Sequence, residues 1–551
     1  MAKKHSTTAL TPADHARQNE RYAQGHAYDY VIIGTGSSAL TVGSLLAHKG
    51  YKVCLLEAHD IPGGYAQSFK MGDYYFCAQI HYTWGCGPGG KVYEFIKQIG
   101  LEKDITFELY DPTGYDHMVM PDGKRVKIPY GFDKLAENIE AAYPGQKAAV
   151  SKFCDILTKL REEMTTFPQG KLSWWHYVTQ GYKFLTLLKY KNATLQEVFD
   201  ECGLSREAQA VLIANAGDMM ASPEELSIFS YAGLFGGYNT GAYYPSKHFR
   251  YYVDRLCKFI TDHEGCHIYY EQPVVKIETR GDQVTSVQTK DGKVFTAKHF
   301  ICNMDPQAAA KMIGWEKFPS SFQKPLSYSY SPSGMVVYLG LKDIDLHKHG
   351  FGKHNIWHLE DWDMNKTWKE QLKGDFSKPW FFISTPTLHT NEGGTTPPGG
   401  QIMEIATLTD YTSFKQAQDR SYAEYVKMKN ALAERLLDLV EKYYVPDLRK
   451  HIAVKVVGTT VTNEDFVMAP HGNAYGSHMT PEQLTLGRLR AETPWKNFFW
   501  CNASSGYAGL YGTVGTGMQL YMQLTGDQFY DGSKSPTDEQ FIRELQERLH
   551  R

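Results

Sequence analysis

The stretch YDYVIIGTGSSALTVGSLLAHKGYKVCLLEAHDIPGG (28–64) decides the fold. Residues 30–33 form a short apolar, β-branched run of the kind found in buried parallel strands. Gly34 follows at once and permits a tight turn, and Gly36 lets the backbone approach a pyrophosphate. The helix expected from Ser37 points its free N–H groups and the positive end of its dipole at the phosphates. The order predicts a dinucleotide-binding unit.

A second strand and a second pair of glycines indicate which dinucleotide is bound. Residues 53–56 read as the next strand, and Glu57 stands about 20 residues after the turn, where a carboxylate can hold ribose hydroxyls. Gly63 and Gly64 follow, although a nicotinamide domain needs no glycine pair at this place. In one class of flavin proteins such a pair lets the chain pass close to the flavin's phosphates. A flavin dinucleotide is therefore favoured.

From these residues onward the chain resembles a known family. LLEAHDIPGGYAQSFKMGDYYFCAQIHYTWG (55–85) is similar to the phytoene desaturase, carotenoid isomerase and retinol saturase group of FAD proteins. The likeness continues through NATLQEVFDECGL (192–204), the stretch 271–306 and the stretch 497–524, in the family's order. It covers residues from about 27 to 530. The resemblance implies FAD as cofactor and hydride exchange between flavin and the double bonds of a long apolar lipid.

The resemblance also implies where FAD is held. Val274 corresponds to a residue whose backbone contacts the adenine half, and Gly515-Thr516-Gly517 to a helix start that points at the flavin's pyrimidine ring. The residues expected to bind the cofactor are Gly34, Gly36, Ser37, Ser38, Glu57, Ala58, Gly63, Gly64, Val274, Asn502, Gly515 and Thr516.

Three side chains are expected to carry the chemistry. In the family the region of His81 and Tyr82 runs along the flavin ring, where a histidine exchanges protons near neutral pH and a tyrosine is a weak acid. Tyr511 belongs to the stretch that closes over the flavin. The alternative is that His81 and Tyr82 only shape the cavity and that Tyr511 only lines a polyene channel.

Two departures from the family pattern bear on the substrate. The family usually has a glycine pair after the tyrosine-proline, where this chain has Ser246-Lys247-His248-Phe249. In our interpretation Lys247 and His248 replace small residues and narrow a cavity or meet a polar head group. The family often has Gly-Asp or Gly-Gln before its last helix, where this chain has Cys501-Asn502. Asn502 can still hydrogen-bond, but it carries no charge.

The fold expected is α/β, with a discontinuous Rossmann-type FAD-binding domain and an α+β substrate domain under a helical cap. Strands are expected at 268–277, 284–289 and 294–302, and capping boxes predict helix starts at Thr194 and Ser222. The expected boundaries are 1–26 for a flexible N-terminal arm, 27–110, 245–315 and 485–530 for the FAD-binding domain, 111–244 and 316–484 for the substrate domain, and 531–551 for a C-terminal helix.

Composition narrows the class of partner. The net charge of −3 argues against a nucleic-acid binder that relies on a basic field. Nine scattered cysteines without a Cys-x-x-Cys motif favour a reduced protein, and no metal-ligating spacing occurs. The N-terminus does not read as a secretory signal, so we expect a cytoplasmic or organelle-stromal protein.

One segment is a candidate for peripheral membrane contact. Residues 171–191 mix tryptophan, phenylalanine and leucine with four lysines, as in helices that lie in a lipid interface. A substrate as apolar as a carotenoid must be collected from a membrane. The alternative is an amphipathic cap helix packed on the substrate domain.

The function expected is that of an FAD-dependent oxidoreductase or isomerase acting on carbon–carbon double bonds of a carotenoid, retinoid or polyunsaturated fatty acid. Only one strand–glycine–helix fingerprint is present, so electrons must come from outside the chain unless the reaction is redox-neutral. Two alternatives stay open: an amine-oxidase-like flavoenzyme, and a non-catalytic carrier of prenyl or isoprenoid lipids on the same fold.

Overall fold

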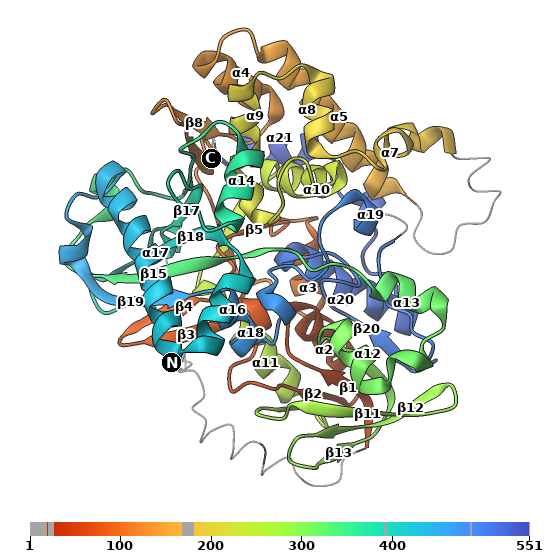
Figure 1. Cartoon of the computed structure of the whole chain (residues 1–551). Coiled ribbons are helices and arrows are strands. Elements are labelled where there is room, and N and C mark those ends of the chain that lie inside the picture. The colour runs from red at the N-terminus through yellow and green to blue at the C-terminus, as the bar shows by residue number, and fades with distance from the viewer. Residues whose placement is uncertain (1–18, 20–26, 168–180, 391–393, 485–486, 550–551) are drawn as a thin grey trace, which may run out of the picture.

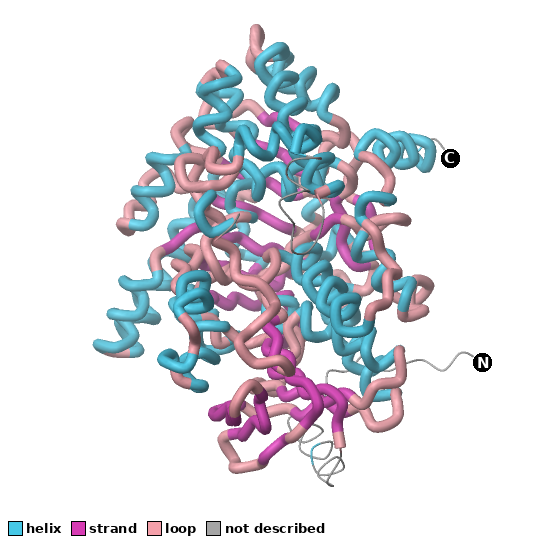
Figure 2. The backbone as a smooth tube through the Cα atoms, turned by 90° about the vertical axis from the view of Figure 1, so that its right-hand side faces the viewer, coloured by secondary structure: helices cyan, strands magenta, loops and turns pink. Residues whose placement is uncertain are grey.

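The protein has a nucleotide-binding part, a second sheet and a cap of helices (Figure 1). The computed structural model describes residues 19, 27–167, 181–390, 394–484 and 487–549. Figure 2 shows the cap helices at one end of the molecule and the small sheet β11–β13 at the other.

The nucleotide-binding part is built on a parallel sheet in the order β10-β2-β1-β14-β20. Its strands come from three distant stretches of the chain, and most of their side chains are buried. The carboxyl ends of these strands meet at one edge, which is where open α/β sheets bind ligands. The predicted α/β fold with a Rossmann-type domain is confirmed. The strands are β1 (Tyr28–Ile33), β2 (Val53–Leu56), β10 (His267–Tyr269), β14 (Ala297–Cys302) and β20 (Phe498–Trp500).

Helix α2 (Ser37–His48) is buried along almost its whole length. It packs against α11 (His248–Asp262) and α20 (Gly509–Thr525), and its buried residues Ser38 to Ala47 lie on every face of the helix. A Cβ atom on Gly517 of α20 would lie 2.6 Å from the carbonyl oxygen of Ser38, so the two helices touch through a glycine.

Two of the predicted strands are each divided in the structure. The run 268–277 separates into β10 and β11 (Val274–Arg280), because Glu271 adopts a left-handed φ of 54° just before Pro273. The run 294–302 likewise separates into β13 (Val294–Phe295) and β14. β11, β12 (Gln283–Thr289) and β13 form a small antiparallel sheet of their own.

The second sheet has seven strands in the order β19-β15-β18-β17-β16-β7-β8. Only the β16–β7 pair is parallel within it. Its central strands are buried on both faces, so it forms the floor beneath the cap. The strands are β7 (Asp116–Val119), β8 (Arg125–Ile128), β15 (Ser333–Leu341), β16 (Asn355–His358), β17 (Phe381–Ser384), β18 (Gln401–Thr409) and β19 (Ile452–Gly458).

Of the two helix starts predicted in the cap, the structure confirms one. Thr194 caps α8 with a complete capping box. The prediction at Ser222 is wrong: a turn follows it, and the next helix, α10, has Ser227 as its N-cap. The main cap helices are α4 (Phe132–Ala142), α5 (Lys147–Thr166), α8 (Leu195–Cys202), α9 (Arg206–Ile213) and α10 (Ile228–Asn239).

The two ends of the chain are described to different extents. The predicted arm 1–26 lies outside the described residues except for Asn19, whose side chain bonds to both backbone groups of Tyr270. Within the predicted C-terminal helix, α21 spans Asp538–Leu549 after a short 3₁₀ turn at Gly532–Lys534. Within the part of the chain that the structure describes, no helix has the length and apolar character needed to cross a bilayer.

Candidate active site

The two glycine-rich turns predicted to bind the cofactor lie against each other. Gly34 has a φ of 100°, and α2 begins at Ser37 without a side-chain cap on its first N–H groups. A Cβ atom on Gly64 would stand 3.3 Å from the Cα atom of Gly36, and Gly36 forms a parallel bridge with Gly63. The two turns therefore approach each other without side chains between them, and a bound pyrophosphate requires such close access to the backbone.

Asn303 holds this turn in place, and sequence reasoning did not single it out. It follows β14 directly, at the same sheet edge as Gly34. Its Oδ1 accepts from the Gly36 N–H at 2.8 Å, while its Nδ2 donates to Ser38 Oγ and to the Cys501 carbonyl. A polar residue just after a buried parallel strand was the available signal. The hydroxyl of Ser38, a residue predicted to contact the cofactor, is thus hydrogen-bonded to Asn303.

Glu57 stands at the end of β2, buried beside the first turn. Its carboxylate accepts from the N–H and hydroxyl of Thr35 and, at 2.9 Å, from the N–H of His59. Burial raises the pKa of Glu57. Ala58 and Pro273 line a cavity of about 470 Å³ that opens next to it, and Val274 follows Pro273 as the first residue of β11.

These features fit FAD. The glycine cradle has no room for side chains, a carboxylate ends the second strand, and a cavity lies where the adenosine half is expected. When bound, FAD supplies a centre that accepts or donates a hydride. Which residues contact it stays a prediction.

Three predicted cofactor contacts, Gly515, Thr516 and Asn502, lie in other surroundings than expected. The predicted helix start at 515–517 is wrong, because α20 begins at Gly509 and Gly515 and Thr516 lie inside it. Thr516 Oγ1 donates to the Gly512 carbonyl. Asn502 bonds inside the protein, to the Met304 carbonyl and to the Ser505 N–H. Glycine is needed in α20 because neighbouring residues pack closely against the helix, and not because the chain turns there.

His81 meets a buried carboxylate. It lies between β4 (Tyr74–Cys77) and β5 (Thr83–Trp84), and its Nδ1 is 2.8 Å from Oε2 of Glu404. Glu404 is fully buried in β18, and its Oε1 has no hydrogen-bond partner among the described residues. Sequence reasoning missed Glu404; the signal was a single acidic residue in the apolar run 401–409. The pair can hold and pass on one proton.

Tyr82 and Tyr511 are linked by aromatic rings. Tyr82 stacks on Tyr238 with ring centroids 4.0 Å apart, Tyr238 meets Trp84 at 4.8 Å, and Trp84 stacks on Tyr511 at 4.8 Å. We call Tyr82, Tyr238, Trp84 and Tyr511 the aromatic row. Lys91 lies with its Nζ 4.4 Å from the Tyr511 ring, and burial lowers the pKa of Lys91. The structure thus brings two of the three predicted catalytic residues into one row, with His81 next to it in the chain.

The residue that departs from the family's glycine pair takes a glycine-like backbone. His248 has a φ of 70°, in the left-handed region that favours glycine. Its ring is buried, its Nδ1 accepts from the Arg250 N–H, and its Nε2 has no partner in the described ranges. The proposed role of Lys247 and His248 toward a polar head group stays a hypothesis.

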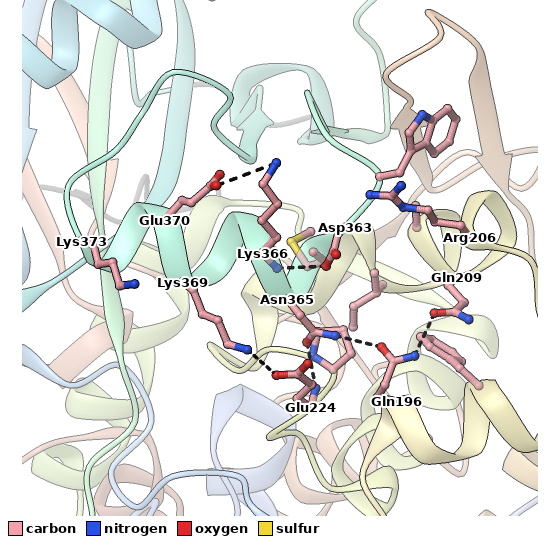
Figure 3. Close-up of a pocket in the computed structure, with 16 residues that line it drawn as sticks. Gln196, Arg206, Gln209, Glu224, Asp363, Asn365, Lys366, Lys369, Glu370 and Lys373 are labelled. Carbon is pink, nitrogen blue, oxygen red and sulfur yellow. Dashed lines mark hydrogen bonds and ion pairs between the residues drawn. The ribbon is translucent and has the colours of Figure 1, made fainter.

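A larger cavity elsewhere has a different character. It measures about 560 Å³ and lies between α8, α9 and α14 (Met364–Leu372) (Figure 3). Lys369 pairs with Glu224 at 2.7 Å and Lys366 with Glu370 at 3.8 Å, so its lining is polar and charged. It holds none of the predicted site residues, and we do not take it as the active site. No cluster of three or more metal-ligating side chains occurs among the described residues.

Comparison with known proteins agrees with this geometry. Residues 40–519 match the model of the family described as flavin containing amine oxidoreductase. All-trans-retinol 13,14-reductase of Danio rerio is 22% identical over 86% of this chain and 81% of its own length. Chloroplastic prolycopene isomerase of Arabidopsis thaliana is 24% identical over 82% of this chain and 74% of its own length. The resemblance to the retinol saturase and carotenoid isomerase group is therefore confirmed.

Solved structures share the fold at low identity. Putrescine oxidase bound to putrescine has a TM-score of 0.62 at 12% identity, covering 91% of this chain and 99% of the other. Cyclohexylamine oxidase from Brevibacterium oxydans has a TM-score of 0.60 at 13% identity, covering 94% of this chain and 100% of the other. The chain belongs to the flavin-containing amine oxidoreductase family and is an FAD-dependent enzyme.

Proposed function

We propose that this enzyme acts on carbon–carbon double bonds of a long apolar polyene, by hydride exchange with its flavin. The observation that carries the proposal is the aromatic row, whose flat apolar rings suit a conjugated chain and which includes Tyr82 and Tyr511. The names of the relatives support it, since one reduces a retinol and the other isomerises a carotenoid. Retinoid, carotenoid and polyunsaturated fatty acid stay the candidate substrates.

In this proposal the chain's own residues position the polyene and move a proton. The proton that the substrate exchanges comes from His81 or from Tyr82, and Glu404 fixes the orientation of the His81 ring through the 2.8 Å contact at Nδ1. Phe382, packed 4.9 Å from the His81 ring, keeps that side of the pair dry. The electrons of a net reduction come from an external donor.

The test is turnover of candidate lipids by the purified holoenzyme. The protein is incubated anaerobically, with its flavin oxidised or chemically reduced, with all-trans-retinol, prolycopene or linoleic acid, and the products are separated by chromatography. We expect a saturated or isomerised polyene. Oxidation of putrescine or cyclohexylamine, with every polyene unchanged, would replace the proposal with amine oxidation.

The His81–Glu404 pair gives the sharpest variant. Glu404→Gln is expected to lower the turnover rate about 100-fold with flavin content unchanged, because it removes the partner that orients His81. The chain offers a matched control in the second His–Glu pair, His358 and Glu360, 3.1 Å apart. Glu360→Gln should leave turnover unchanged, and equal losses in both variants would mean that Glu404 acts only on stability.

We also propose that the outer face of the 3₁₀ turn η2 (Gly181–Phe184) and of helix α7 (Leu185–Tyr190) touches a membrane. Tyr182, Leu185 and Leu188 are 67%, 63% and 52% exposed, whereas Phe184 and Tyr190 pack inward. The rest of the predicted segment, 171–180, lies outside the described residues. Apolar side chains beside lysines suit the interface of an anionic bilayer. A helix packed by one face on the cap is thus compatible with lipid contact by the other.

Sedimentation with phospholipid vesicles tests this contact. Changing Leu185 and Leu188 to Ser should release the protein from vesicles that contain anionic lipid. Tyr422→Ser is the matched control, since Tyr422 is 68% exposed on the distant helix α17 (Tyr422–Tyr443). Equal binding by all three proteins would refute the contact.

A further inference from the structure

The hydroxyl of Tyr82 lies between two carboxylates. It is 2.7 Å from Oδ2 of Asp218 and 3.0 Å from Oδ2 of Asp116. Asp116 begins β7 and is fully buried, while Asp218 ends the 3₁₀ turn η3 (Ala214–Asp218) of the cap. Three distant parts of the sequence thus meet at one hydroxyl, next in the chain to His81.

The hydroxyl of Tyr82 has fewer protons than it has neighbouring carboxylates. A tyrosine hydroxyl has one proton and can donate it to one carboxylate only. If both carboxyls of Asp116 and Asp218 were ionised, one would face the oxygen lone pairs of Tyr82 without a proton between them. Two buried negative charges this close also repel each other. One carboxyl must therefore carry a proton and donate it to the Tyr82 oxygen.

Among the described residues, no cationic side chain contributes to the pKa of Asp116 or Asp218. Trp357 and Asn355 lie near enough to Asp116 to favour its ionised form, but their side-chain N and O atoms complete no hydrogen bond of ordinary geometry within the described ranges. The titratable groups that face the pair from the packed elements are Tyr82, Tyr110, Tyr115, Tyr238 and Tyr475, with Glu404 beyond Tyr110. All of them are neutral or acidic.

Burial acts in the same direction. It raises the pKa of Asp116 to about 7, and it raises the pKa of Asp218 above its usual range. Because these folded-state pKa values lie above those of an unfolded chain, protonation stabilises the fold. That contribution is complete below the ordinary pKa of aspartate and is lost as the pH rises through about 7.

The same chain contains the opposite arrangement. The carboxylate of Asp305 accepts from Tyr330 at 2.8 Å and from Tyr328 at 3.0 Å. Two hydroxyl protons serve one carboxylate there, so no further proton is required. Asp305 is thus a control with the same residue types and the reverse ratio.

We propose that Asp116, Tyr82 and Asp218 share one proton and form the store from which the double-bond chemistry draws it. This use of the proton rests on the proposed function. When a double bond is saturated, the O–H bond of Tyr82 breaks as a C–H bond forms on the substrate. The O–H bond of the protonated carboxyl breaks as a new one forms on Tyr82, and solvent later returns a proton to the pair.

The electrons balance with one external reagent. The hydride for the neighbouring carbon comes from flavin that an outside two-electron donor has reduced. In this proposal Tyr82, a member of the aromatic row, is the residue that touches the substrate. Asp116 and Asp218 act through Tyr82, as residues that hold and position its proton.

Infrared difference spectroscopy of the holoenzyme detects the shared proton directly. Spectra at about pH 5.5 and about pH 9 should differ by the carbonyl band of a protonated carboxylic acid, which shifts in D2O. The double variant Asp116→Asn with Asp218→Asn should lose the part of this band that comes from the pair, because neither amide can hold the shared proton. Asp305→Asn should keep it.

Other outcomes would overturn the shared proton. A wild-type spectrum without the band, or a band of unchanged intensity in the double variant, would exclude it. Because the readout needs no substrate, it stays valid if no polyene reacts and the proposed function fails. If a polyene does react, Asp218→Asn should lower the rate at least about 10-fold and move the alkaline limb of its pH profile. An unchanged rate and profile would refute the store while leaving the function intact.

Discussion

Two glycine-rich segments that look alike in sequence do different work in the structure. Both Gly34-Thr35-Gly36 and Gly515-Thr516-Gly517 were interpreted as helix starts that face the cofactor. After the first, α2 begins at Ser37. The second lies inside α20, which begins six residues before Gly515, at Gly509. The same Gly-Thr-Gly pattern therefore marks a turn in one place and a helix interior in the other.

The backbone explains the difference. Gly34 has a φ of 100°, a conformation that other residues rarely adopt, so glycine is needed for its torsion angles. Gly515 and Gly517 are helical, and glycine is needed there for space: a Cβ atom would lie 2.8 Å from Lys91 Cδ or 2.6 Å from the Ser38 carbonyl oxygen. A run of glycines indicates that the backbone comes close to another part of the protein or to a ligand. Only a buried strand directly before the glycines indicates that they form a turn and not the interior of a helix.

The largest effect is expected at the turn. Gly36→Ala places a Cβ atom 2.5 Å from Oδ1 of Asn303 and disrupts the 2.8 Å bond from the Gly36 N–H. We expect FAD to bind about 100-fold more weakly, as a loss of roughly 2–3 kcal/mol implies. The ratio of flavin to protein absorbance and a titration with added FAD measure it.

Gly43→Ala is the control for this change. Gly43 lies in the same helix α2, and its Cβ would meet three side chains only at 3.4 Å. Alanine also favours the helix. Flavin binding should stay at the wild-type level, and a matching loss in both variants would mean that α2 as a whole, and not the turn, controls the cofactor.

Much of the fold followed from local patterns. Local sequence alone predicted the first two strands and the turn between them correctly. They are the apolar run 30–33, the glycines after it and the run 53–56. The predictions that were wrong concern element boundaries that depend on the conformation of neighbouring residues. Glu271 ends a strand through one left-handed residue before Pro273, and Ser227 rather than Ser222 caps the next helix because Ser222 opens a turn.

The candidate site was harder to predict than the fold. His81 and Tyr82 were identified from the region they occupy, but their partners Glu404, Asp116 and Asp218 were not. Each partner lies more than 30 positions away in sequence, and its role exists only because β18, β7 and the cap meet there. A lone acidic residue in an apolar run gives a hint of burial but names no partner.

A smaller effect, of another kind, is expected inside α20. Gly517→Ala pushes a Cβ atom against the Ser38 carbonyl oxygen and separates α20 from α2, which should cost about 1–3 kcal/mol of unfolding free energy. Thermal unfolding with saturating FAD present would show a lower Tm, while flavin content per folded molecule stays normal. Lost flavin with an unchanged Tm would restore the cofactor role first predicted for this segment.

The smallest effect is expected two residues earlier, at Gly515. Its Cβ would meet the Cδ and Nζ atoms of Lys91 at 2.8 and 2.9 Å, but that side chain is flexible and can shift along the Tyr511 ring. Alanine gains up to about 1 kcal/mol of helix propensity, which offsets the displacement. Gly515→Ala should therefore keep its Tm within about 2 °C of the wild type. A loss as large as that of Gly517→Ala would show that Lys91 is held rigidly, and the glycines of α20 would then form one continuous contact surface instead of a single point of contact with α2.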